Sequence, residues 1–433
     1  MPTITGTNDA DLLLGTAEAD TISGLAGNDI IDGRAGADMM IGGEGDDIFI
    51  VDDVLDPVDE ESGEGTDEVR ASVNYVLGLD IENLVLTGSA IEGTGNGLNN
   101  VIVGNGSSNI LRGGGGADIL IGGTGDDHFV VEGTVTALGE NGYAFGGIDE
   151  VVETADAGID HVTSNVSYTI GSNVENLTLI GTFNLSGFGN ALDNTILGNS
   201  GNNFLQGFDG DDYLDGGPRA DFLVGGDGDD TYVIDDVNDD IGVESPHAEG
   251  GIDTVRSSIS IALDFSIENL VLTGSAAING TGTSFNNRME GNDAGNVLAS
   301  GFGDDELEGN GGNDVLASDT GNDVLSGGSG ADTMSGGSGA DIFLDTAAGL
   351  SGDTITDLSA GDAIIISDAA LAEFTFNVSG TTLTFSGGSI TLGAPVDGAI
   401  VASSAAGGGV QLTVRPYDPE NDFNGDGRSD ILM

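Results

Sequence analysis

Aspartate residues recur at every ninth position near the start of the chain, at Asp11, Asp20, Asp29, Asp38 and Asp47. A glycine stands five residues before each of them, and a large apolar residue stands two residues after it. Carboxylates in such a regular series suit metal binding, because hard cations such as calcium take roughly six to eight oxygen ligands. The first question is therefore which structure would bring these carboxylates into register.

The nine-residue period continues through four blocks, which start at Gly6, Gly95, Gly189 and Gly282 and contain five, four, five and seven units. Of these 21 units, fifteen have Asp and six have Asn at the sixth position, and all have Leu, Ile, Met, Phe or Tyr at the eighth. Six glycine-rich residues favour a turn, since glycine adopts positive φ without steric cost, and three residues form a short strand. The pattern predicts an all-β parallel β-roll with two units per coil rather than a disordered linker.

Stacked coils would place successive turns about 4.8 Å apart. An ion midway between two turns would lie about 2.4 Å from each, which matches the roughly 2.3–2.6 Å that calcium prefers. Magnesium prefers shorter bonds, and transition metals favour His or Cys ligands, whereas this chain has no Cys and three His without a common period. Calcium, in several copies, is therefore the expected ion.

The units GGEGDDIFI, GGTGDDHFV, GGDGDDTYV and GGSGADTMS resemble the calcium-binding nonapeptides of the RTX (repeats-in-toxin, hemolysin-type) family, GGxGxDxUx. The resemblance covers 189 of the 433 residues. It implies a parallel β-roll and export by a type I secretion system of Gram-negative bacteria. It also implies one calcium ion between each loop and the loop two units later, bound by the two sixth-position carboxylates. Further ligands would be carbonyls of the second and fourth positions of one loop and of the first and third positions of the other.

Carried over to this chain, the resemblance implies seven pairs of aspartates: Asp11 with Asp29, Asp20 with Asp38, Asp29 with Asp47, Asp212 with Asp230, Asp305 with Asp323, Asp314 with Asp332, and Asp323 with Asp341. Six further pairings place Asn opposite Asp, such as Asn109 with Asp127 and Asn203 with Asp221; Asp118 belongs to the same group. Because Asn carries no charge, these sites are expected to bind more weakly or to stay empty. The implied carbonyl ligands are those of Thr7, Asp9, Thr16, Glu18, Gly24, Leu25, Ala26, Gly27, Gly33, Ala35, Gly42, Glu44, Gly113, Gly115, Gly122, Thr124, Phe208, Gly210, Gly216, Pro218, Gly225, Asp227, Gly301, Gly303, Gly309, Asn310, Gly311, Gly312, Ser318, Asp319, Thr320, Gly321, Gly327, Ser329, Gly336 and Ser338.

Three connectors between the blocks are similar to one another and start at equal intervals, at Gly65, Gly158 and Gly251. Their alternating apolar residues predict short β-strands with one buried face, so we expect one continuous solenoid with wider coils at the connectors. The middle connector carries an insertion near 141–156, expected to be a protruding loop. The segments expected are 1–51 (first block), 52–130, 131–233 and 234–345 (each a connector with the next block), 346–415 (C-terminal β cap) and 416–433 (tail).

The tail contains alternating oxygen-bearing residues at Asp422, Asn424, Asp426 and Asp430. This spacing resembles the start of the calcium loop of FG-GAP or dockerin-type repeats, which share alternate oxygen ligands with the EF-hand loop. A complete EF-hand loop would have Glu where Met433 stands. We therefore interpret the tail as a weaker candidate calcium site, either a truncated module or a vestige.

Composition excludes several classes of protein. With a net charge of −66 and no Lys, the chain is not expected to bind nucleic acid or to insert into a membrane. It has no run of about 20 apolar residues, and no zincin, nucleophile-elbow or P-loop motif. The chain is therefore not expected to be an enzyme. A polysaccharide-active β-helix enzyme is the remaining catalytic alternative, for which Arg70, Arg112, Arg256 and Arg288 qualify as bases by residue type alone.

These observations together predict an extracellular, calcium-binding RTX structural protein that folds on calcium after export. No cap precedes Gly6, so an open first coil is expected to support self-assembly into a surface layer, filament or matrix. The alternative is an adhesin or the calcium-binding carrier module of a larger secreted protein. The expected partners are calcium, further copies of the chain and the type I secretion machinery, with cell-surface polysaccharide as a further candidate. The expected location is the cell exterior or surface.

Overall fold

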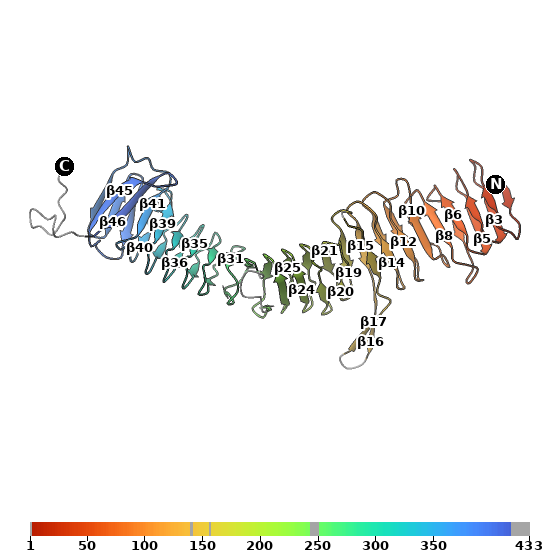
Figure 1. Ribbon diagram of the computed structural model, residues 1–433, viewed down its shortest axis with the longest axis horizontal. Coiled ribbons are helices and arrows are strands. Elements are labelled where there is room, and N and C mark those ends of the chain that lie inside the picture. The colour runs from red at the N-terminus through yellow and green to blue at the C-terminus, as the bar shows by residue number, and fades with distance from the viewer. Residues whose placement is uncertain (1, 139–141, 156, 243–250, 417–433) are drawn as a thin grey trace, which may run out of the picture. The chain divides into compact units, whose positions relative to one another are not determined.

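The computed structural model describes residues 2–138, 142–155, 157–242 and 251–416, and every regular element in these ranges is a β-strand. The chain divides into two compact units, Met1–Asp227 and Gly228–Met433. In each unit, short parallel strands stack into a β-solenoid (Figure 1). The predicted fold class, an all-β parallel β-roll, is therefore confirmed. Across the described ranges, no helix is long and apolar enough to span a membrane.

The first unit has strands that pair in four parallel series, interrupted by one antiparallel hairpin. The first series is β1 (Thr3–Thr5), β3 (Thr21–Ala26), β5 (Met39–Glu44) and β7 (Val58–Asp59). The second is β2 (Leu12–Leu14), β4 (Ile30–Asp32), β6 (Ile48–Val51), β8 (Glu68–Ala71), β10 (Asn83–Leu86), β12 (Val101–Val103), β14 (Ile119–Ile121) and β18 (Glu150–Val152). The third is β9 (Tyr75–Val76), β11 (Glu92–Thr94), β13 (Ile110–Arg112), β15 (His128–Val131), β19 (His161–Ser164), β21 (Asn176–Leu179), β23 (Thr195–Leu197) and β25 (Tyr213–Asp215), and the fourth is β20 (Tyr168–Thr169), β22 (Ser186–Phe188), β24 (Phe204–Asp209) and β26 (Phe222–Asp227).

The second unit repeats this arrangement with two parallel series and ends in antiparallel strands. One series is β27 (Thr231–Ile234), β29 (Thr254–Ser257), β31 (Asn269–Leu272), β33 (Arg288–Glu290), β35 (Glu306–Glu308), β37 (Val324–Ser326), β39 (Ile342–Asp345) and β41 (Ala363–Ile366). The other is β30 (Ile261–Ala262), β32 (Gly280–Thr281), β34 (Val297–Ala299), β36 (Val315–Ala317), β38 (Thr333–Ser335) and β40 (Thr354–Ile355), with β28 (Asp240–Ile241) as a further short strand. The antiparallel strands are β42 (Phe376–Ser379), β43 (Thr382–Phe385), β44 (Gly388–Leu392), β45 (Ala399–Ser404) and β46 (Val410–Arg415).

The eighth-position residues form the core. Leu13 pairs with Ile31, which in turn pairs with Phe49, so each of these residues meets the equivalent residue two units later. Their side chains are 8 %, 0 % and 0 % exposed. Each fully buried side chain of this size stabilises the fold by roughly 1.5–3 kcal/mol. The period therefore fixes both the coil length and the interior, and it leaves the turns at the edges.

Each connector continues the stack of its own unit, but the connectors do not form uniformly wider coils. Around the first connector, Ile48 of β6 pairs with Glu68 of β8, which pairs with Asn83 of β10. The first of these coils is two residues longer than two nonapeptides, and the second is three residues shorter. In the second unit, the coil from Thr254 to its partner Asn269 is likewise short. In a connector, a wide coil is thus followed by a narrow one. The expectation of wider coils is confirmed only for the first of these two coils.

The insertion in the second connector forms a two-stranded antiparallel hairpin. Its strands, β16 (Thr134–Leu138) and β17 (Gly142–Gly146), project from the stack (Figure 1). The hairpin begins earlier than the predicted 141–156, and β18 already pairs with β14 again at 150–152. The predicted bounds start too late because the first hairpin strand follows the end of β15 at Val131 after only Glu132 and Gly133.

The last strands of both series are covered by strands of the C-terminal segment. Strand β41 pairs with β46 in antiparallel fashion, whereas β40 pairs in parallel with β44, which itself pairs antiparallel with β43. The parallel stacks of the second unit therefore end against a segment that folds back on itself in antiparallel pairs. Such a cover removes the open edge that a solenoid end otherwise presents.

Candidate metal centres

The turn of each unit directs its sixth-position aspartate inward at the edge of the roll. Asp20 and Asp38 are 0 % exposed, and Asp29 and Asp47 are 1 % exposed. The turns can stack closely because of glycine: Gly27, at the fourth position, has φ +109°, and a methyl group there would lie 2.7 Å from the backbone carbon of Asp9 in the preceding coil. The repeat glycines therefore allow both the positive φ and the close approach of neighbouring loops.

After the first coil, one carboxylate oxygen of a sixth-position aspartate accepts a hydrogen bond from the backbone of the preceding coil. Asp11 and Asp20 of the first coil instead accept from Thr7 N and Thr16 N of their own loops. The Asp11 N–H donates to Asp29 Oδ1 at 2.7 Å, and the Asp29 N–H donates to Asp47 Oδ1 at 2.7 Å. We call each continuous series of such bonds a carboxylate ladder. Six of the seven predicted aspartate pairs are joined in this way: Asp11–Asp29, Asp20–Asp38, Asp29–Asp47, Asp305–Asp323, Asp314–Asp332 and Asp323–Asp341.

The other carboxylate oxygen is buried and accepts no hydrogen bond from any described residue. This holds for Oδ1 of Asp20 and for Oδ2 of Asp29, Asp38, Asp47, Asp118, Asp127, Asp305, Asp314, Asp323, Asp332 and Asp341. A buried acceptor without a donor is costly, by roughly 1–3 kcal/mol and more when it is charged. A row of such atoms therefore indicates a group that must be supplied from outside the chain.

These oxygens face backbone carbonyls of the next coil. A methyl group added at Gly309 would lie 2.6 Å from Asp314 Oδ2 and 2.6 Å from the Gly327 carbonyl oxygen. A methyl group at Gly24 would similarly meet Asp29 Oδ2 and lie 2.7 Å from the Gly42 carbonyl oxygen. Carboxylate and carbonyl oxygens thus converge on a space that only glycine leaves open. This donor set consists of oxygen alone, as calcium requires.

The electrostatics of the ladder also favour a cation. Burial, with neighbouring carboxylates adding to it, raises the pKa of Asp29 and Asp38, and it raises the pKa of Asp47 to about 7. In the second unit, burial and the nearby Asp332 raise the pKa of Asp314 to about 6. The charged form is therefore unfavourable until a counter-ion is present.

The predicted carbonyl ligands occupy the stacked turns, and some also accept hydrogen bonds between coils. The Asn310 carbonyl accepts from Ser329 N at 2.7 Å, and the Asp319 carbonyl accepts from Ser338 N at 2.8 Å. The Thr7 carbonyl accepts from Ala26 N at 3.4 Å. A carbonyl oxygen has two lone pairs, so one such bond leaves capacity for a metal. Their role as ligands stays a prediction.

The units with asparagine at the sixth position differ from those with aspartate in the hydrogen bonds that they make to the preceding coil. Asn100 Oδ1 faces the same space as an aspartate Oδ2 would, next to the Gly113 carbonyl. Its Nδ2, however, donates to the carbonyls of Ile81 and Glu82 in the connector, at 3.0 and 3.1 Å. The same bond to a preceding carbonyl is made by Nδ2 of Asn109, Asn194, Asn203, Asn287 and Asn296. Asparagine therefore occurs where a block follows a connector and the preceding coil presents carbonyl oxygens.

The pairing of Asp212 with Asp230 stays a prediction, and the predicted tail site lies outside the described residues. Asp212 and Asp230 belong to different units; Asp212 Oδ1 accepts from Asn194 N at 2.7 Å, and Asp230 N donates to Asp253 Oδ1 at 2.9 Å. In the loop after Gly216, Pro218 is followed by Arg219, whose φ is +90° at the fourth position, where most other units have glycine. The tail residues Asp422, Asn424, Asp426 and Asp430 lie outside the described residues.

The ladders extend into the connectors, which the sequence prediction did not include. The Asp47 N–H donates to Asp67 Oδ1 at 2.8 Å, and the Asp67 N–H donates to Glu82 Oε2 at 2.8 Å. Equivalent bonds end on Glu175 and Glu268. The signal was present: each connector starts with Gly-x-Asp-x-Val, which retains the sixth-to-eighth spacing of the repeat, and contains Glu-Asn-Leu. Other aspartates that continue ladders are Asp56, Asp149, Asp160, Asp253, Asp353 and Asp362.

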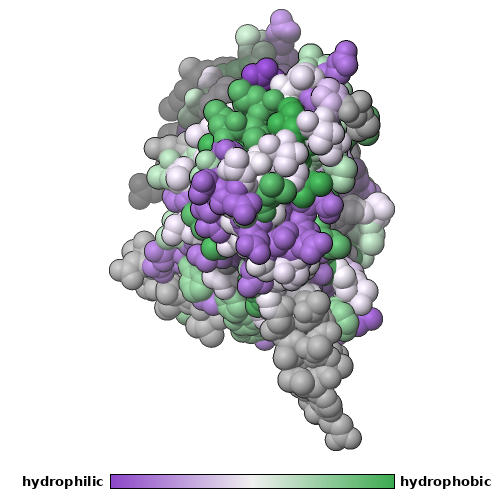
Figure 2. All heavy atoms as spheres, turned by 90° about the vertical axis from the view of Figure 1, so that its right-hand side faces the viewer, coloured by the Kyte–Doolittle hydropathy of each residue, from purple (hydrophilic) through white to green (hydrophobic). Residues whose placement is uncertain are grey.

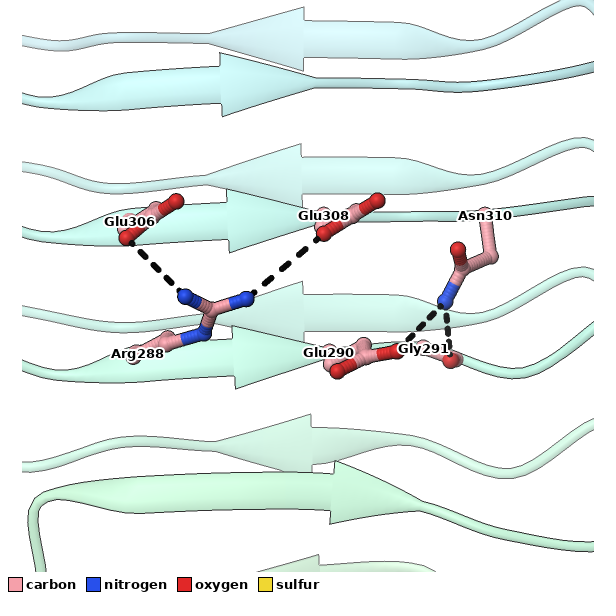
Figure 3. A network of polar contacts seen from close by, with 6 residues as sticks. All are labelled: Arg288, Glu290, Gly291, Glu306, Glu308 and Asn310. Carbon is pink, nitrogen blue, oxygen red and sulfur yellow. Dashed lines mark hydrogen bonds and ion pairs between the residues drawn. The ribbon is translucent and has the colours of Figure 1, made fainter.

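One of the two arginines considered as possible bases in the second unit, Arg288, pairs with carboxylates. Figure 3 shows Arg288 of β33 reaching across to β35, where its guanidinium lies 3.6 Å from Glu306 Oε2 and 3.9 Å from Glu308 Oε2. These side chains are about half exposed, so each pair contributes only about 0.2–1 kcal/mol. In the first unit, Arg70 likewise pairs with Glu68.

Two histidines that appear unrelated in the sequence lie together. The rings of His128 and His161, on the paired strands β15 and β19, stack with centroids 5.0 Å apart. Their Nε2 atoms bond Thr163 Oγ1 at 2.8 Å and Thr178 Oγ1 at 2.9 Å. Burial lowers the pKa of both imidazoles. They therefore form a neutral, hydrogen-bonded stack on a face of the roll.

Coils of two nonapeptides, inward-facing aspartates and facing carbonyls define a β-roll whose turns present oxygen atoms suited to a metal ion. The family model of the RTX calcium-binding nonapeptide repeat, which spans four copies, matches residues 5–40, 14–49, 94–129, 188–218, 281–316 and 308–343. The chain is therefore a protein with RTX calcium-binding nonapeptide repeats. None of the curated proteins compared with it matches the chain.

Proposed function

We propose that this chain is an extracellular calcium-binding repeat protein whose roll folds when calcium is bound. The observation that carries the proposal is the row of buried carboxylate oxygens, such as Asp314 Oδ2, that face carbonyls and accept no hydrogen bond from described residues. Calcium would supply two positive charges and accept this oxygen-only ligand set. The matched repeat family is also a calcium-binding one.

Folding and binding would be coupled, because the turns that hold the ligands exist only in the folded roll. A ligand that binds only the folded state stabilises it in proportion to RT ln(1 + [L]/Kd). Extracellular calcium modules bind at roughly 10⁻⁴–10⁻³ M. The carboxylates repel one another in the low calcium of a cytosol, which favours an extended chain suited to export by a type I system. Outside the cell, calcium would shift the equilibrium to the roll.

Circular dichroism of the full chain tests this proposal. We expect a coil spectrum in chelator and a β spectrum in millimolar calcium, with equimolar magnesium as the control. A β spectrum that chelator leaves unchanged would contradict the proposal. So would a spectrum restored equally well by magnesium, since the site would then lack the preference that its oxygen number implies.

We further propose that the folded chains self-assemble at the cell surface. In the first coil, β1 pairs only with β3 and β2 only with β4 among the described strands. Leu12 and Leu14 of β2 are 64 % and 41 % exposed, and Figure 2 shows hydrophobic surface at the end that faces the viewer. Strand edges with exposed apolar side chains favour pairing with another chain.

Electron microscopy of the protein with calcium and with chelator tests assembly. Ordered polymers only in calcium would support a surface layer, filament or matrix. A calcium-folded monomer at high concentration would instead favour an adhesin or a carrier module. The proposal assigns no catalytic activity, and turnover of an acidic polysaccharide that one substitution abolishes would contradict that part.

A further inference from the structure

A connector glutamate enters the last loop of the first block. Glu60 follows β7 and is 7 % exposed. Its Oε1 accepts from Gly42 N at 2.7 Å, and its Oε2 accepts from Gly43 N at 3.3 Å. Gly42 and Gly43 are the first two residues of the last nonapeptide in that block. The glutamate is thus held by the same turn that carries Asp47.

Three carboxylates meet at this point. Asp47, Glu60 and Asp67 each place one oxygen so that the three atoms lie within 4.8 Å of one another. Asp47 and Asp67 are both 1 % exposed, and the Asp47 N–H donates to Asp67 Oδ1 at 2.8 Å. Asp47 Oδ2 is buried and accepts no hydrogen bond from any described residue. The nearby Arg70 pairs with Glu68 on the same strand.

The second block ends in the same arrangement. Asp127, Glu153 and Asp160 also bring three oxygens within 4.8 Å, and they are 1 %, 9 % and 0 % exposed. The Asp127 N–H donates to Asp160 Oδ1 at 2.7 Å. Asp127 Oδ2, Glu153 Oε1 and Asp160 Oδ2 are all buried without a hydrogen-bond partner in the described structure. The arrangement recurs although the hairpin separates Asp127 from Glu153, and in both connectors the glutamate precedes the aspartate by the same interval.

The glutamate oxygen takes the position that a carbonyl has inside a block. A methyl group at Gly24 would meet Asp29 Oδ2 and the Gly42 carbonyl of the next coil. At Gly42 it would meet Asp47 Oδ2 and Glu60 Oε1 instead. At Gly122 the corresponding atoms are Asp127 Oδ2 and Glu153 Oε1. Where no further nonapeptide follows, a charged oxygen therefore replaces a neutral one in the same open space.

We propose that Asp47–Glu60–Asp67 and Asp127–Glu153–Asp160 are two calcium sites that close the first and second blocks, with three carboxylates each where a site inside a block has two. The inference rests on the proposed function, because it assigns calcium to these oxygens. Ligand charge count is one of the properties that set calcium affinity. The closing sites are therefore expected to fill at lower calcium than the sites inside the blocks, and to hold each connector against its block.

The charges agree with this assignment. Burial, with Asp67 adding to it, raises the pKa of Glu60 to about 8, and burial raises the pKa of Glu153 to about 7. Three adjacent buried carboxylates without a counter-ion are unfavourable. A shared proton is the competing way to relieve that repulsion, and the experiment separates the two.

The test compares the full chain with Glu60→Gln and Glu153→Gln, singly and together. Gln removes the charge, and at residue 60 it keeps an acceptor for the N–H groups of Gly42 and Gly43. Glu61→Gln and Glu150→Gln are matched controls, because these neighbouring glutamates are exposed. Isothermal titration calorimetry gives affinities, and native mass spectrometry counts bound calcium, with circular dichroism at saturating calcium as the check of folding.

We expect each substitution to weaken one tight site by about tenfold or more or to remove one bound calcium, and the double variant to lose both, while the controls bind as the parent does. If the double variant binds as many calcium ions as the parent, with the same affinities, the inference is overturned. It is also overturned if a variant is more stable than the parent in chelator while its calcium binding is unchanged, because that result indicates a shared proton. If Glu60→Gln does not fold at saturating calcium, Glu153→Gln decides by the same criteria. A parent chain that binds no calcium would instead refute the proposed function itself.

Discussion

The backbone N–H of Asp29 donates to Oδ1 of Asp47, in the next coil, at 2.7 Å, while Oδ2 of Asp47 is buried and accepts no hydrogen bond from described residues. One carboxylate thus has two roles: one oxygen fixes the register of adjacent coils, and the other is left available to the calcium ion of the proposed site. Because both roles use the same side chain, loss of the ion and loss of coil stacking are physically linked.

Substitution of one ladder aspartate should act in opposite directions with and without calcium. For Asp29→Asn we expect the calcium midpoint of folding to rise about tenfold, equivalent to about 1.4 kcal/mol, because a charged ligand is lost. In chelator the variant should be slightly more stable than the parent, since burial raises the pKa of Asp29 and the charge is unfavourable there. Calcium titrations followed by circular dichroism check both. The control Asp46→Asn removes an exposed charge from the fifth position, and an equal effect there would refute the site-specific explanation.

The open space at the first position of a loop should not tolerate a methyl group. In Gly309→Ala the new Cβ would lie 2.6 Å from Asp314 Oδ2 and from the Gly327 carbonyl, so we expect a destabilisation of about 1–3 kcal/mol and loss of the local calcium site. Gly311→Ala, in the same loop, places its Cβ no closer than 3.4 Å to any neighbour and should be nearly neutral. Thermal unfolding at saturating calcium distinguishes the two variants. Similar melting temperatures would argue against an open space at Gly309 that is reserved for a calcium ion.

Proton binding should partly replace calcium. Burial raises the pKa of Asp47 and Asp353 to about 7 and that of Glu60 to about 8, above their unfolded values near 4. The ion-free folded chain therefore binds more protons than the unfolded chain, and its stability is present at low pH and is lost as pH rises toward about 8. With calcium the dependence should reverse, because protons compete with the ion for the carboxylates.

The measurement is the β signal in circular dichroism across this pH range, once in chelator and once in calcium. A signal in chelator that grows as pH rises would contradict this prediction.

Asparagine at the start of a block should not be exchangeable for aspartate. Asn100 Nδ2 donates to the carbonyls of Ile81 and Glu82, and an aspartate there would direct a buried carboxylate at two carbonyl oxygens. We expect Asn100→Asp to destabilise the calcium-bound chain by about 1–3 kcal/mol, measured by thermal unfolding. Asn99→Asp is the exposed neighbouring control. A gain of one bound calcium in Asn100→Asp would show that the connector carbonyls accept a cation after all.

The roll and the register of its aspartates could be predicted from the sequence, because the apolar and acidic residues that determine them recur with a strict period. A fixed apolar residue such as Ile31 in every ninth position specifies the interior, and a fixed aspartate such as Asp29 follows the same period on the edge. Pairing between every second unit is then a consequence of two units per coil. Six of the predicted pairs lie in register for this reason.

What the sequence did not reveal lies where the period is interrupted. The interval from Asp127 to Glu153 is twice the interval from Asp47 to Glu60. Glu60 and Glu153 therefore occupy equivalent places in the structure although their spacing from the preceding aspartate differs. His128 and His161 are distant in the sequence because the hairpin is inserted between them, and they stack because β15 and β19 pair with these two residues opposite each other. The distinct role of Asn100 likewise depends on which atoms the preceding connector presents, and a sequence pattern does not show that.

The hairpin β16–β17 has a consequence for how such a chain can change over time. It is inserted within one coil, yet β14 still pairs with β18 and β15 with β19. Neighbouring strands therefore keep their partners both in the narrow connector coils and in the coil that the hairpin enlarges. In a stack where each coil contacts mainly its neighbours, length along the axis is set by the number of coils, while extra residues extend sideways. New surface features can thus be added or removed at such coils with the spacing between successive loops unchanged.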